Sequence, residues 1–290
     1  MRGWCRPRTR GDTLPPSLAA GAGLAAAGAV LLTVTACGAG GPAPAGPGPK
    51  AAAQHQVLPA RVSAAVLAKL PRATTYATIP RAPGDPAPFA RTGGLVVHPR
   101  VPQVVYAGPG KRPVAVLPDA ELGGPAWVPV VQTSPGWERV LLPSRPNRAT
   151  GWIYTGGTRA AQLTTRRTSY RVLINLDARR LSVYDGGRLL GRWTVAVGSR
   201  ATPTPTGRTF LLALLAPQHP TYSPLILPLG FHSNTLTTFG GGPGTVGLHG
   251  WPNRSVFGHA ISHGCVRVPA TGLRVLSRVP LGSLVVITAR

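Results

Sequence analysis

The residue types best suited to chemistry gather in one short stretch near the C-terminus, between His249 and Arg267. This stretch holds a cysteine, Cys265, and a second histidine close to it, His263. A thiol attacks as its thiolate, and near neutral pH it needs a neighbouring base or cation to form one. Both His249 and His263 are candidate bases, and residue type alone does not choose between them. The stretch therefore predicts a cysteine nucleophile with a histidine as its proton acceptor.

The residues beside Cys265 indicate how a substrate would be held. Gly264 allows the backbone to approach a substrate closely, and successive N–H groups there could bind an oxyanion. Arg267 could grip a substrate carboxylate, with a structural or solvated arginine as an equal alternative. Ser262, in the same segment, is a further candidate for substrate binding.

A long Pro- and Gly-rich region, 213–247, precedes this stretch. Loops of that length above an active site often act as lids. His232 within the region and Trp251 just after it are candidates to line a substrate groove. Core or surface roles are equally open for both.

Composition narrows the classes of function. The 290 residues include 31 Lys and Arg against 7 Asp and Glu, a net charge of +24. So few acids argue against chemistry by paired carboxylates, whereas a Cys/His pair needs none. The positive charge suits an anionic partner, which could be nucleic acid, a membrane surface or an acidic wall polymer.

The N-terminus predicts the compartment. Four arginines in the first ten residues precede a small-residue apolar run, 17–32, as in a secretory signal. The run leads to Val34-Thr35-Ala36-Cys37, which resembles a bacterial lipobox, so we expect a signal peptide over 1–36 and a lipid on Cys37. The alternatives are an ordinary cleavable signal or an uncleaved anchor, although 16 residues are few for a spanning helix. A lipid-anchored protein on the outer face of the cytoplasmic membrane, facing the cell wall, would not meet nucleic acid.

Processing also singles out Cys265. With Cys5 removed and Cys37 lipidated, Cys265 would be the one remaining thiol, and no intramolecular disulfide could form. A free thiol in an oxidising compartment is a liability unless it has a function. The alternative is a buried, inert cysteine.

The remaining sequence predicts a mostly β chain with two folded parts. We expect a flexible Pro/Gly/Ala linker over 37–93, interrupted by a short helix at 62–70. Alternating runs and turn residues predict a small antiparallel β-barrel over 94–160 and a catalytic domain over 168–290 with one helix at 269–279. The barrel strands are expected at 103–106, 113–117, 126–131, 138–142 and 151–154, and the catalytic strands at 170–176, 180–184, 187–198 and 284–288.

Three tryptophans mark the first folded part. The segments around Trp127, Trp137 and Trp152 resemble bacterial Src-homology-3-like modules that bind the wall or act as spacers. The rings could form a ligand groove, but core packing of a small barrel is the favoured interpretation.

The second folded part resembles the L,D-transpeptidases of the YkuD family. Ser262-His-Gly-Cys-Val-Arg267, with His249-Gly250 sixteen residues before the cysteine, resembles the family signature, and Thr204-Pro-Thr-Gly207 and the strand at 193–198 also fit. The resemblance runs over 170–287 and implies a β-sandwich. It also implies cleavage after the third residue of a peptidoglycan tetrapeptide stem, release of D-Ala, and transfer to an amine of a second stem, which gives a 3→3 cross-link.

The resemblance also implies roles for residues. Cys265 matches the nucleophile, His249 the proton acceptor and donor in preference to His263, and His263 and Gly264 the oxyanion loop. Some relatives carry Ser after the catalytic histidine; with Gly250 there, a backbone oxygen must orient the ring of His249. No cofactor is implied, and carbapenems are expected to acylate the enzyme.

Three other functions remain open. His249, His259, His263 and Cys265 could bind zinc, but no acid is near and the spacing fits no zinc module, so we expect no metal. The same acyl-enzyme could serve an L,D-carboxypeptidase or a wall-protein anchoring enzyme. The chain could also be a wall-binding lipoprotein without activity.

Overall fold

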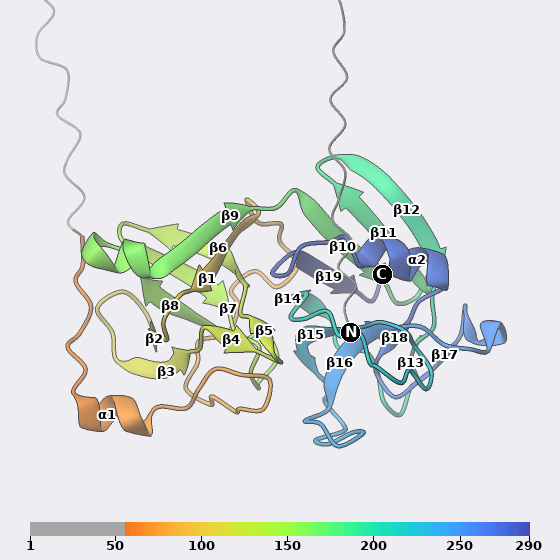
Figure 1. The fold of residues 1–290 in the computed structure, drawn as a ribbon, viewed down its shortest axis with the longest axis horizontal. Coiled ribbons are helices and arrows are strands. Elements are labelled where there is room, and N and C mark those ends of the chain that lie inside the picture. The colour runs from red at the N-terminus through yellow and green to blue at the C-terminus, as the bar shows by residue number, and fades with distance from the viewer. Residues whose placement is uncertain (1–55) are drawn as a thin grey trace, which may run out of the picture. The chain divides into compact units, whose positions relative to one another are not determined.

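The computed structural model describes residues 56–290, in which strands dominate, as predicted (Figure 1). The predicted signal peptide, Cys37 and the linker residues 37–55 lie outside the described residues. Within residues 56–290, no helix has the length and apolar character needed to cross a membrane.

An N-terminal module is built on one antiparallel sheet of seven strands in the order β3-β2-β8-β7-β6-β1-β9. All five strands predicted here are present. Two more extend the sheet at one edge: β1 lies between β6 and β9, and β9 occupies residues between the two predicted domains. The strands are β1 (Leu95–Pro99), β2 (Gln103–Tyr106), β3 (Pro113–Leu117), β6 (Val128–Ser134), β7 (Trp137–Leu141), β8 (Thr150–Tyr154) and β9 (Leu163–Arg167), with a small hairpin of β4 (Ala120–Glu121) and β5 (Gly124–Pro125) and a 3-10 helix, η1 (Gly157–Gln162).

The tryptophans of this module follow the core interpretation in two cases of three. Trp137 and Trp152 are buried, and Trp137 meets the ring of Tyr106 edge to face at 5.2 Å. The indole N–H of Trp137 also donates to the Val57 carbonyl at 2.7 Å. Trp127 is half-buried, and the guanidinium of Arg166 lies 3.8 Å from the centre of its ring.

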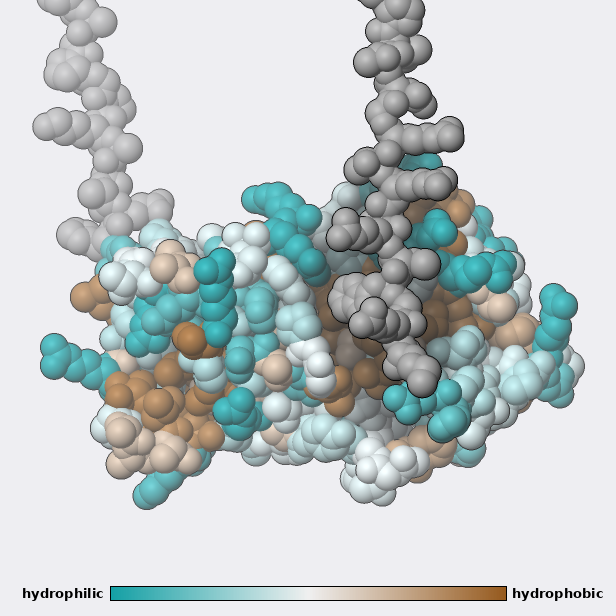
Figure 2. Space-filling model, in the orientation of Figure 1, coloured by the Kyte–Doolittle hydropathy of each residue, from teal (hydrophilic) through white to brown (hydrophobic). Residues whose placement is uncertain are grey.

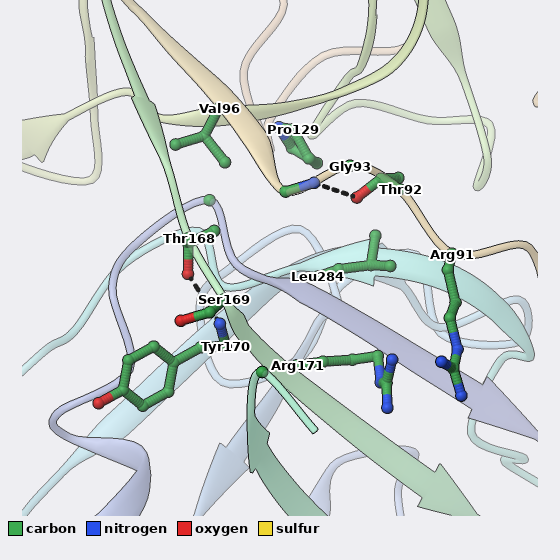
Figure 3. Close-up of a pocket in the computed structure, with 13 residues that line it drawn as sticks. Arg91, Thr92, Gly93, Val96, Pro129, Thr168, Ser169, Tyr170, Arg171 and Leu284 are labelled. Carbon is green, nitrogen blue, oxygen red and sulfur yellow. Dashed lines mark hydrogen bonds between the residues drawn. The ribbon is translucent and has the colours of Figure 1, made fainter. Parts of the chain in front are cut away.

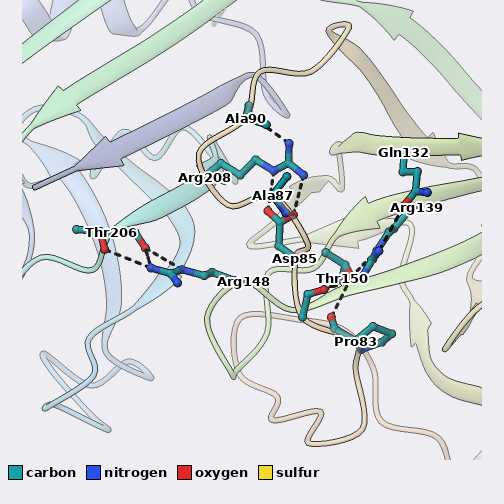
Figure 4. Close-up of polar contacts among 11 residues, drawn as sticks. Pro83, Asp85, Ala87, Ala90, Gln132, Arg139, Arg148, Thr150, Thr206 and Arg208 are labelled. Carbon is teal, nitrogen blue, oxygen red and sulfur yellow. Dashed lines mark hydrogen bonds and ion pairs between the residues drawn. The ribbon is translucent and has the colours of Figure 1, made fainter. Parts of the chain in front are cut away.

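The prediction of a flexible linker is wrong for the residues after the short helix α1 (Ala64–Lys69). Ala73 and Ile79 are fully buried, and Arg72 forms a β-bridge with Val116. Further along, the carboxylate of Asp85 pairs with the guanidinium of Arg208 at 2.6 Å, with both side chains buried (Figure 4). Its prolines lack a backbone N–H and so prevent regular structure, but the carbonyl groups of the segment still accept hydrogen bonds. It is therefore a strap docked on the molecule, and we call residues 71–93 the strap.

The helix α1 itself packs little. None of its six residues is buried, and Val66 and Leu67 are largely exposed. Figure 2 shows the resulting apolar area over α1, bordered by hydrophilic side chains.

The C-terminal module is a sandwich of two sheets. One has the order β12-β11-β10-β19-β14, with β10 and β19 parallel, and the other has the order β15-β16-β18. Apolar side chains from both sheets and from α2 form a single core between them. The elements are β10 (Tyr170–Asn175), β11 (Arg180–Asp185), β12 (Arg188–Thr194), β13 (Val197–Gly198), β14 (Gly207–Phe210), β15 (Ile226–His232), β16 (Thr245–His249), η2 (Arg254–Val256), β17 (Ala260–Ser262), β18 (Val266–Arg267), α2 (Ala270–Leu276) and β19 (Leu284–Thr288).

The long loop predicted at 213–247 is two shorter loops separated by β15. Pro228 and Gly230 within β15 conceal its strand character in the sequence. The strand accommodates them with a register shift against β16 between Pro228 and His232. The second of the two loops, 233–244, is named the covering loop below.

The two modules share a core. Phe210, Leu212, Leu284 and Val286 of the C-terminal module belong to the same apolar cluster as the buried residues of the N-terminal sheet. A cavity of about 310 Å³ lies along their seam, and the side chains of Arg91 and Arg171 reach into it (Figure 3). The two modules are thus packed as one compact unit.

Candidate active site

Strand register brings candidate residues of the stretch between His249 and Arg267 to one face of the sheet β15-β16-β18. In the parallel pair β16 and β18, Leu248 lies beside Val266 and His249 beside Arg267. Paired residues share a face and neighbouring residues alternate. Leu248 and Val266 are fully buried in the core, so His249 and Arg267 project from the opposite face.

Cys265 joins these side chains just before β18. By the same alternation it lies on the face of Arg267, opposite Gly247. The backbone N–H of Gly247 donates to the Cys265 sulfur at 3.4 Å. The thiol, the imidazole and the guanidinium therefore share one face of the sheet.

The ring of His249 is held in one orientation. Its Nδ1 lies 2.7 Å from the carbonyl oxygen of Gly250, which can only accept, so Nδ1 carries the proton and Nε2 is a free base. A backbone oxygen thus orients the ring, as the glycine at 250 predicts. Ser223 supports this arrangement, because its hydroxyl accepts the Gly250 N–H at 2.7 Å and donates to the Leu225 carbonyl.

Burial sets the resting protonation of both groups. Desolvation lowers the pKa of His249, and the positive charge of Arg267 lowers it further against the opposing hydrogen bond to Gly250. Desolvation raises the pKa of Cys265, while the Gly247 N–H and the charge of Arg267 oppose that rise. Both shifts favour the neutral forms, a thiol at Cys265 and an uncharged imidazole at His249.

The segment before Cys265 is fixed by internal hydrogen bonds. The Ser262 hydroxyl donates to the Cys265 carbonyl and accepts the Gly264 N–H at 3.2 Å. Ser262 is buried, so its predicted contact with substrate is wrong: the side chain is used to shape the segment. Gly264 has φ of +114°, which suits glycine, and its amide is already engaged, so it serves the site mainly through its conformation.

Thr204 is a site residue that residue-by-residue reasoning did not single out. Its hydroxyl donates to the Gly264 carbonyl at 2.8 Å and accepts the Gly198 N–H at 2.9 Å. Thr202 makes a similar bond to the Ser262 carbonyl at 2.9 Å. The signal that could have found Thr204 is the segment Thr204-Pro-Thr-Gly207, which was noted in the sequence only as part of the family resemblance.

The two candidate bases occupy different places. His263 is exposed and packs against Phe239 of the covering loop, with ring centres 5.2 Å apart. His249 is buried on the face that holds Cys265. The geometry therefore favours His249 as the base.

An aromatic group borders the site. The guanidinium of Arg267 stacks 3.6 Å from the centre of the Trp251 ring, and Tyr222 meets the ring of His249 edge to face at 5.0 Å. Burial, and to a smaller extent the charge of Cys265, raise the pKa of Tyr222. Trp251 and Tyr222 also line a cavity of about 340 Å³, and the role of Trp251 in a substrate groove stays a prediction.

The predicted substrate contact of His232 is wrong. Its side chain is fully buried, and its Nε2–H donates to the Thr75 carbonyl of the strap at 2.7 Å. Burial lowers the pKa of His232 to about 4. A side chain sealed in the seam cannot reach a substrate groove.

The zinc alternative lacks its ligand cluster. Across residues 56–290, no three His, Cys, Asp or Glu side chains come close enough together to hold a metal ion.

Comparisons with known proteins point to one family. Residues 169–287 match the family model of the L,D-transpeptidase catalytic domain (YkuD). A putative L,D-transpeptidase YkuD of Bacillus licheniformis is 32% identical over 120 residues, which are 41% of this chain and 66% of that protein.

Among solved structures, an L,D-transpeptidase from Mycobacterium smegmatis is 16% identical with a TM-score of 0.34, over 56% of this chain and 99% of that one. The catalytic domain of the E. faecium L,D-transpeptidase is 18% identical with a TM-score of 0.32, over 42% and 99%. L,D-transpeptidase 3 from Mycobacterium tuberculosis, solved with a faropenem-derived adduct, is 13% identical with a TM-score of 0.34, over 49% and 74%. On the family match, residues 169–287 of this chain form a catalytic domain of the YkuD L,D-transpeptidase family.

Proposed function

We propose that the protein is a cysteine-dependent L,D-transpeptidase that forms 3→3 cross-links between peptidoglycan stem peptides. The observation that carries the proposal is the tautomer of His249. With Nδ1–H donated to the Gly250 carbonyl, the basic Nε2 is available on the face that holds the Cys265 thiol.

In the first step, Cys265 attacks the carbonyl carbon of the third residue of a tetrapeptide stem. Nε2 of His249 takes the thiol proton as the carbon–sulfur bond forms, and the backbone amides of His263 and Cys265, on either side of the engaged Gly264 amide, stabilise the oxyanion. The imidazolium then gives its proton to the departing nitrogen of D-Ala. The products are free D-Ala and a thioester on Cys265.

In the second step, an amine of another stem attacks the thioester. His249 takes the proton of the amine, the carbon–sulfur bond breaks, and the proton returns to the Cys265 sulfur. The face needs no carboxylate for either step. With water as acceptor the product would be a tripeptide, as in an L,D-carboxypeptidase, and with an amine of a protein it would be an anchored protein.

The same nucleophile accounts for the expected reaction with carbapenems. Attack of the Cys265 sulfur on the strained lactam carbonyl opens the ring, and the ring nitrogen takes the proton that His249 carries. No group leaves, so the protein gains the full mass of the drug. A carbapenem adduct on Cys265, absent from Cys265→Ala, would support this part of the proposal.

We also propose an extracytoplasmic, lipid-anchored location. The support is the pattern of residues 1–37 described above. Globomycin-sensitive processing and membrane retention of the native chain, both lost in Cys37→Ala, would test it. Retention unchanged by Cys37→Ala would refute lipidation at this residue.

The decisive experiment gives the protein lacking residues 1–55 a defined tetrapeptide and a separate stem peptide with a free amine. Mass spectrometry distinguishes a cross-linked dimer with loss of D-Ala, a hydrolysed tripeptide, and no reaction. The dimer is the expected product, and Cys265→Ala should give none. Turnover that persists in Cys265→Ala would overturn the nucleophile assignment.

A further inference from the structure

The covering loop comes close to the segment of Cys265 at two points. Near its start, the Cβ of Ser233 lies 3.9 Å from where a Cβ on Gly264 would be. Near its middle, the ring of Phe239 packs on His263. Both points lie at the residues immediately before the thiol, so the position of this loop affects the surroundings of Cys265.

The loop is closed on itself by backbone hydrogen bonds between Ser233 and Gly244 and between Phe239 and Gly242, and it is also tied to the other module. Arg145, in the turn between β7 and β8 of the N-terminal module, directs its guanidinium at three of the loop's carbonyl oxygens. The bonds run to Ser233 at 2.9 Å, Leu236 at 3.1 Å and Pro243 at 3.0 Å. One planar side chain thus ties together the start, the middle and the end of the loop.

Asn147 adds a second attachment two residues later. Its side-chain amide donates to the His232 carbonyl at 2.7 Å and to the Asn234 side chain at 2.9 Å. Its side-chain oxygen accepts the backbone N–H of His232 at 2.8 Å. These bonds fix the end of β15, from which the covering loop departs.

The strap in turn fixes Arg145. The backbone N–H of Arg145 donates to the Ala77 carbonyl at 2.9 Å, and its carbonyl accepts the Ile79 N–H at 2.7 Å. Ile79 is itself buried in the core that the two modules share. The guanidinium is therefore presented from a rigid backbone and not from a free turn.

We propose that Arg145 is a positioning residue for the reaction at Cys265, with Asn147 as its support. By holding the covering loop against His263 and Gly264, it makes the N-terminal module a working part of the active site. Arg145 touches no reacting atom; it acts through the loop. The inference rests on the proposed function for its effect on turnover, but the placement of the loop can be measured without turnover.

The test compares Arg145→Ala and Arg145→Lys with Arg112→Ala. Arg112 is an exposed arginine of the same module, and its side chain has no hydrogen bond among residues 56–290. Displacing parts of an active site by about 1 Å can cost roughly 100-fold in rate. We expect Arg145→Ala to lower kcat for tetrapeptide transfer about 10- to 100-fold with KM changed less than threefold. Arg145→Lys should recover part of that loss, since one ammonium cannot span three carbonyls, and Arg112→Ala should match the native protein.

Two measurements do not need a substrate. Hydrogen exchange of the native chain and its variants should speed up at least tenfold across 233–244 in Arg145→Ala alone. Alkylation of Cys265 by iodoacetamide should keep its plateau rate at high pH within twofold, which shows that the site is still folded. Its pH midpoint should fall, because a released loop lets water reach the thiol.

The results test the positioning role of Arg145 separately from the proposed transpeptidase function. If the native protein turns over no tetrapeptide, the proposed function fails, whereas faster exchange and a lower alkylation midpoint would still establish the positioning role. Unchanged exchange and midpoint in Arg145→Ala would overturn it. Faster exchange with native kcat in a protein that does turn over tetrapeptide would also overturn it, because the loop would then not matter to the reaction.

Discussion

Two buried histidines on neighbouring strands show what separates the proposed base from a structural residue. His249 ends β16 and His232 ends β15, and burial lowers the pKa of both. Each gives one ring N–H to a backbone carbonyl, His249 to Gly250 and His232 to Thr75. The difference is where the other nitrogen lies. Nε2 of His249 is on the thiol's face, whereas Nδ1 of His232 is buried with no hydrogen-bond partner within residues 56–290.

The comparison teaches that a lowered pKa and burial do not identify a catalytic residue. Both features are common to the two histidines, and they report only that each ring is neutral and desolvated. What assigns the role is the free nitrogen and its neighbour. The free nitrogen of His249 is on the sheet face that also holds a thiol, whereas that of His232 is enclosed in the packed seam between the modules.

The largest expected effect tests this difference directly. His249→Gln removes the base, and we expect kcat/KM for acyl transfer to fall about 10²- to 10⁴-fold, the usual contribution of a general base. His232→Gln keeps an N–H donor for the Thr75 carbonyl, and its kcat/KM should stay within threefold of native. Steady-state kinetics on the two variants would decide the matter. Equal losses in both would break the comparison.

The next effect concerns the strap that seals His232. Asp85→Ala leaves the Arg208 guanidinium buried without its carboxylate, and losing one partner of a buried pair costs about 3–5 kcal/mol. We expect urea unfolding to show a loss of this size. The reaction at 25 °C should change less than tenfold, because Asp85 belongs to the seam and not to the thiol's face. A loss of less than 1 kcal/mol would mean that the strap is not held by this pair.

A third effect follows from the titration of His232. The unfolded chain protonates this ring near its ordinary pKa of 6.5, and the folded chain only near 4. Between these values the unfolded state binds more protons, so the unfolding free energy falls as the pH drops from about 6.5 to about 4. The shift corresponds to about 3 kcal/mol, at about 1.36 kcal/mol per pKa unit.

Urea unfolding at pH 7 and pH 4 measures this term. The native protein should lose more stability than His232→Gln by about 3 kcal/mol, since glutamine does not titrate. The stability that the neutral ring of His232 contributes, relative to glutamine, should be fully present at pH 7 and lost toward pH 4. An identical pH dependence in the two proteins would show that His232 is protonated without cost.

The same two histidines show how far sequence reasoning reaches. His249 and Cys265 were predictable because their residue types, the glycines beside them and their spacing all lie within one short stretch. The strands at 170–176, 180–184 and 284–288 were predictable for a similar reason, since alternation with period two is a local pattern. The orientation of the His249 ring by a backbone oxygen was also predictable, because Gly250 has no side chain to do it.

The seam was not predictable because its partners are far apart in the chain. The ring of His232 meets Thr75, 157 positions earlier, and Arg208 meets Asp85, 123 positions earlier. No local pattern shows that a proline-rich segment is docked. Ala73 and Ile79 become core residues only because the strap packs against the strands of the N-terminal sheet, which come later in the chain. Ser262 was misassigned for a related reason, because its direction depends on the fold of the segment it shapes.

The smallest expected effect sharpens the comparison at His249, the proposed base. Ser223→Ala removes the hydroxyl that accepts the Gly250 N–H, and so loosens the peptide whose carbonyl orients His249. Leaving a buried N–H without a partner costs about 1–3 kcal/mol, and we expect kcat to fall about threefold to tenfold. Ser277→Ala, which removes an exposed hydroxyl bonded to the Arg274 carbonyl, is the matched control and should leave kcat unchanged. If Ser223→Ala lost stability but kept native kcat, the Gly250 carbonyl would orient the imidazole without help, and the distinction between the two histidines would rest on the position of the free nitrogen alone.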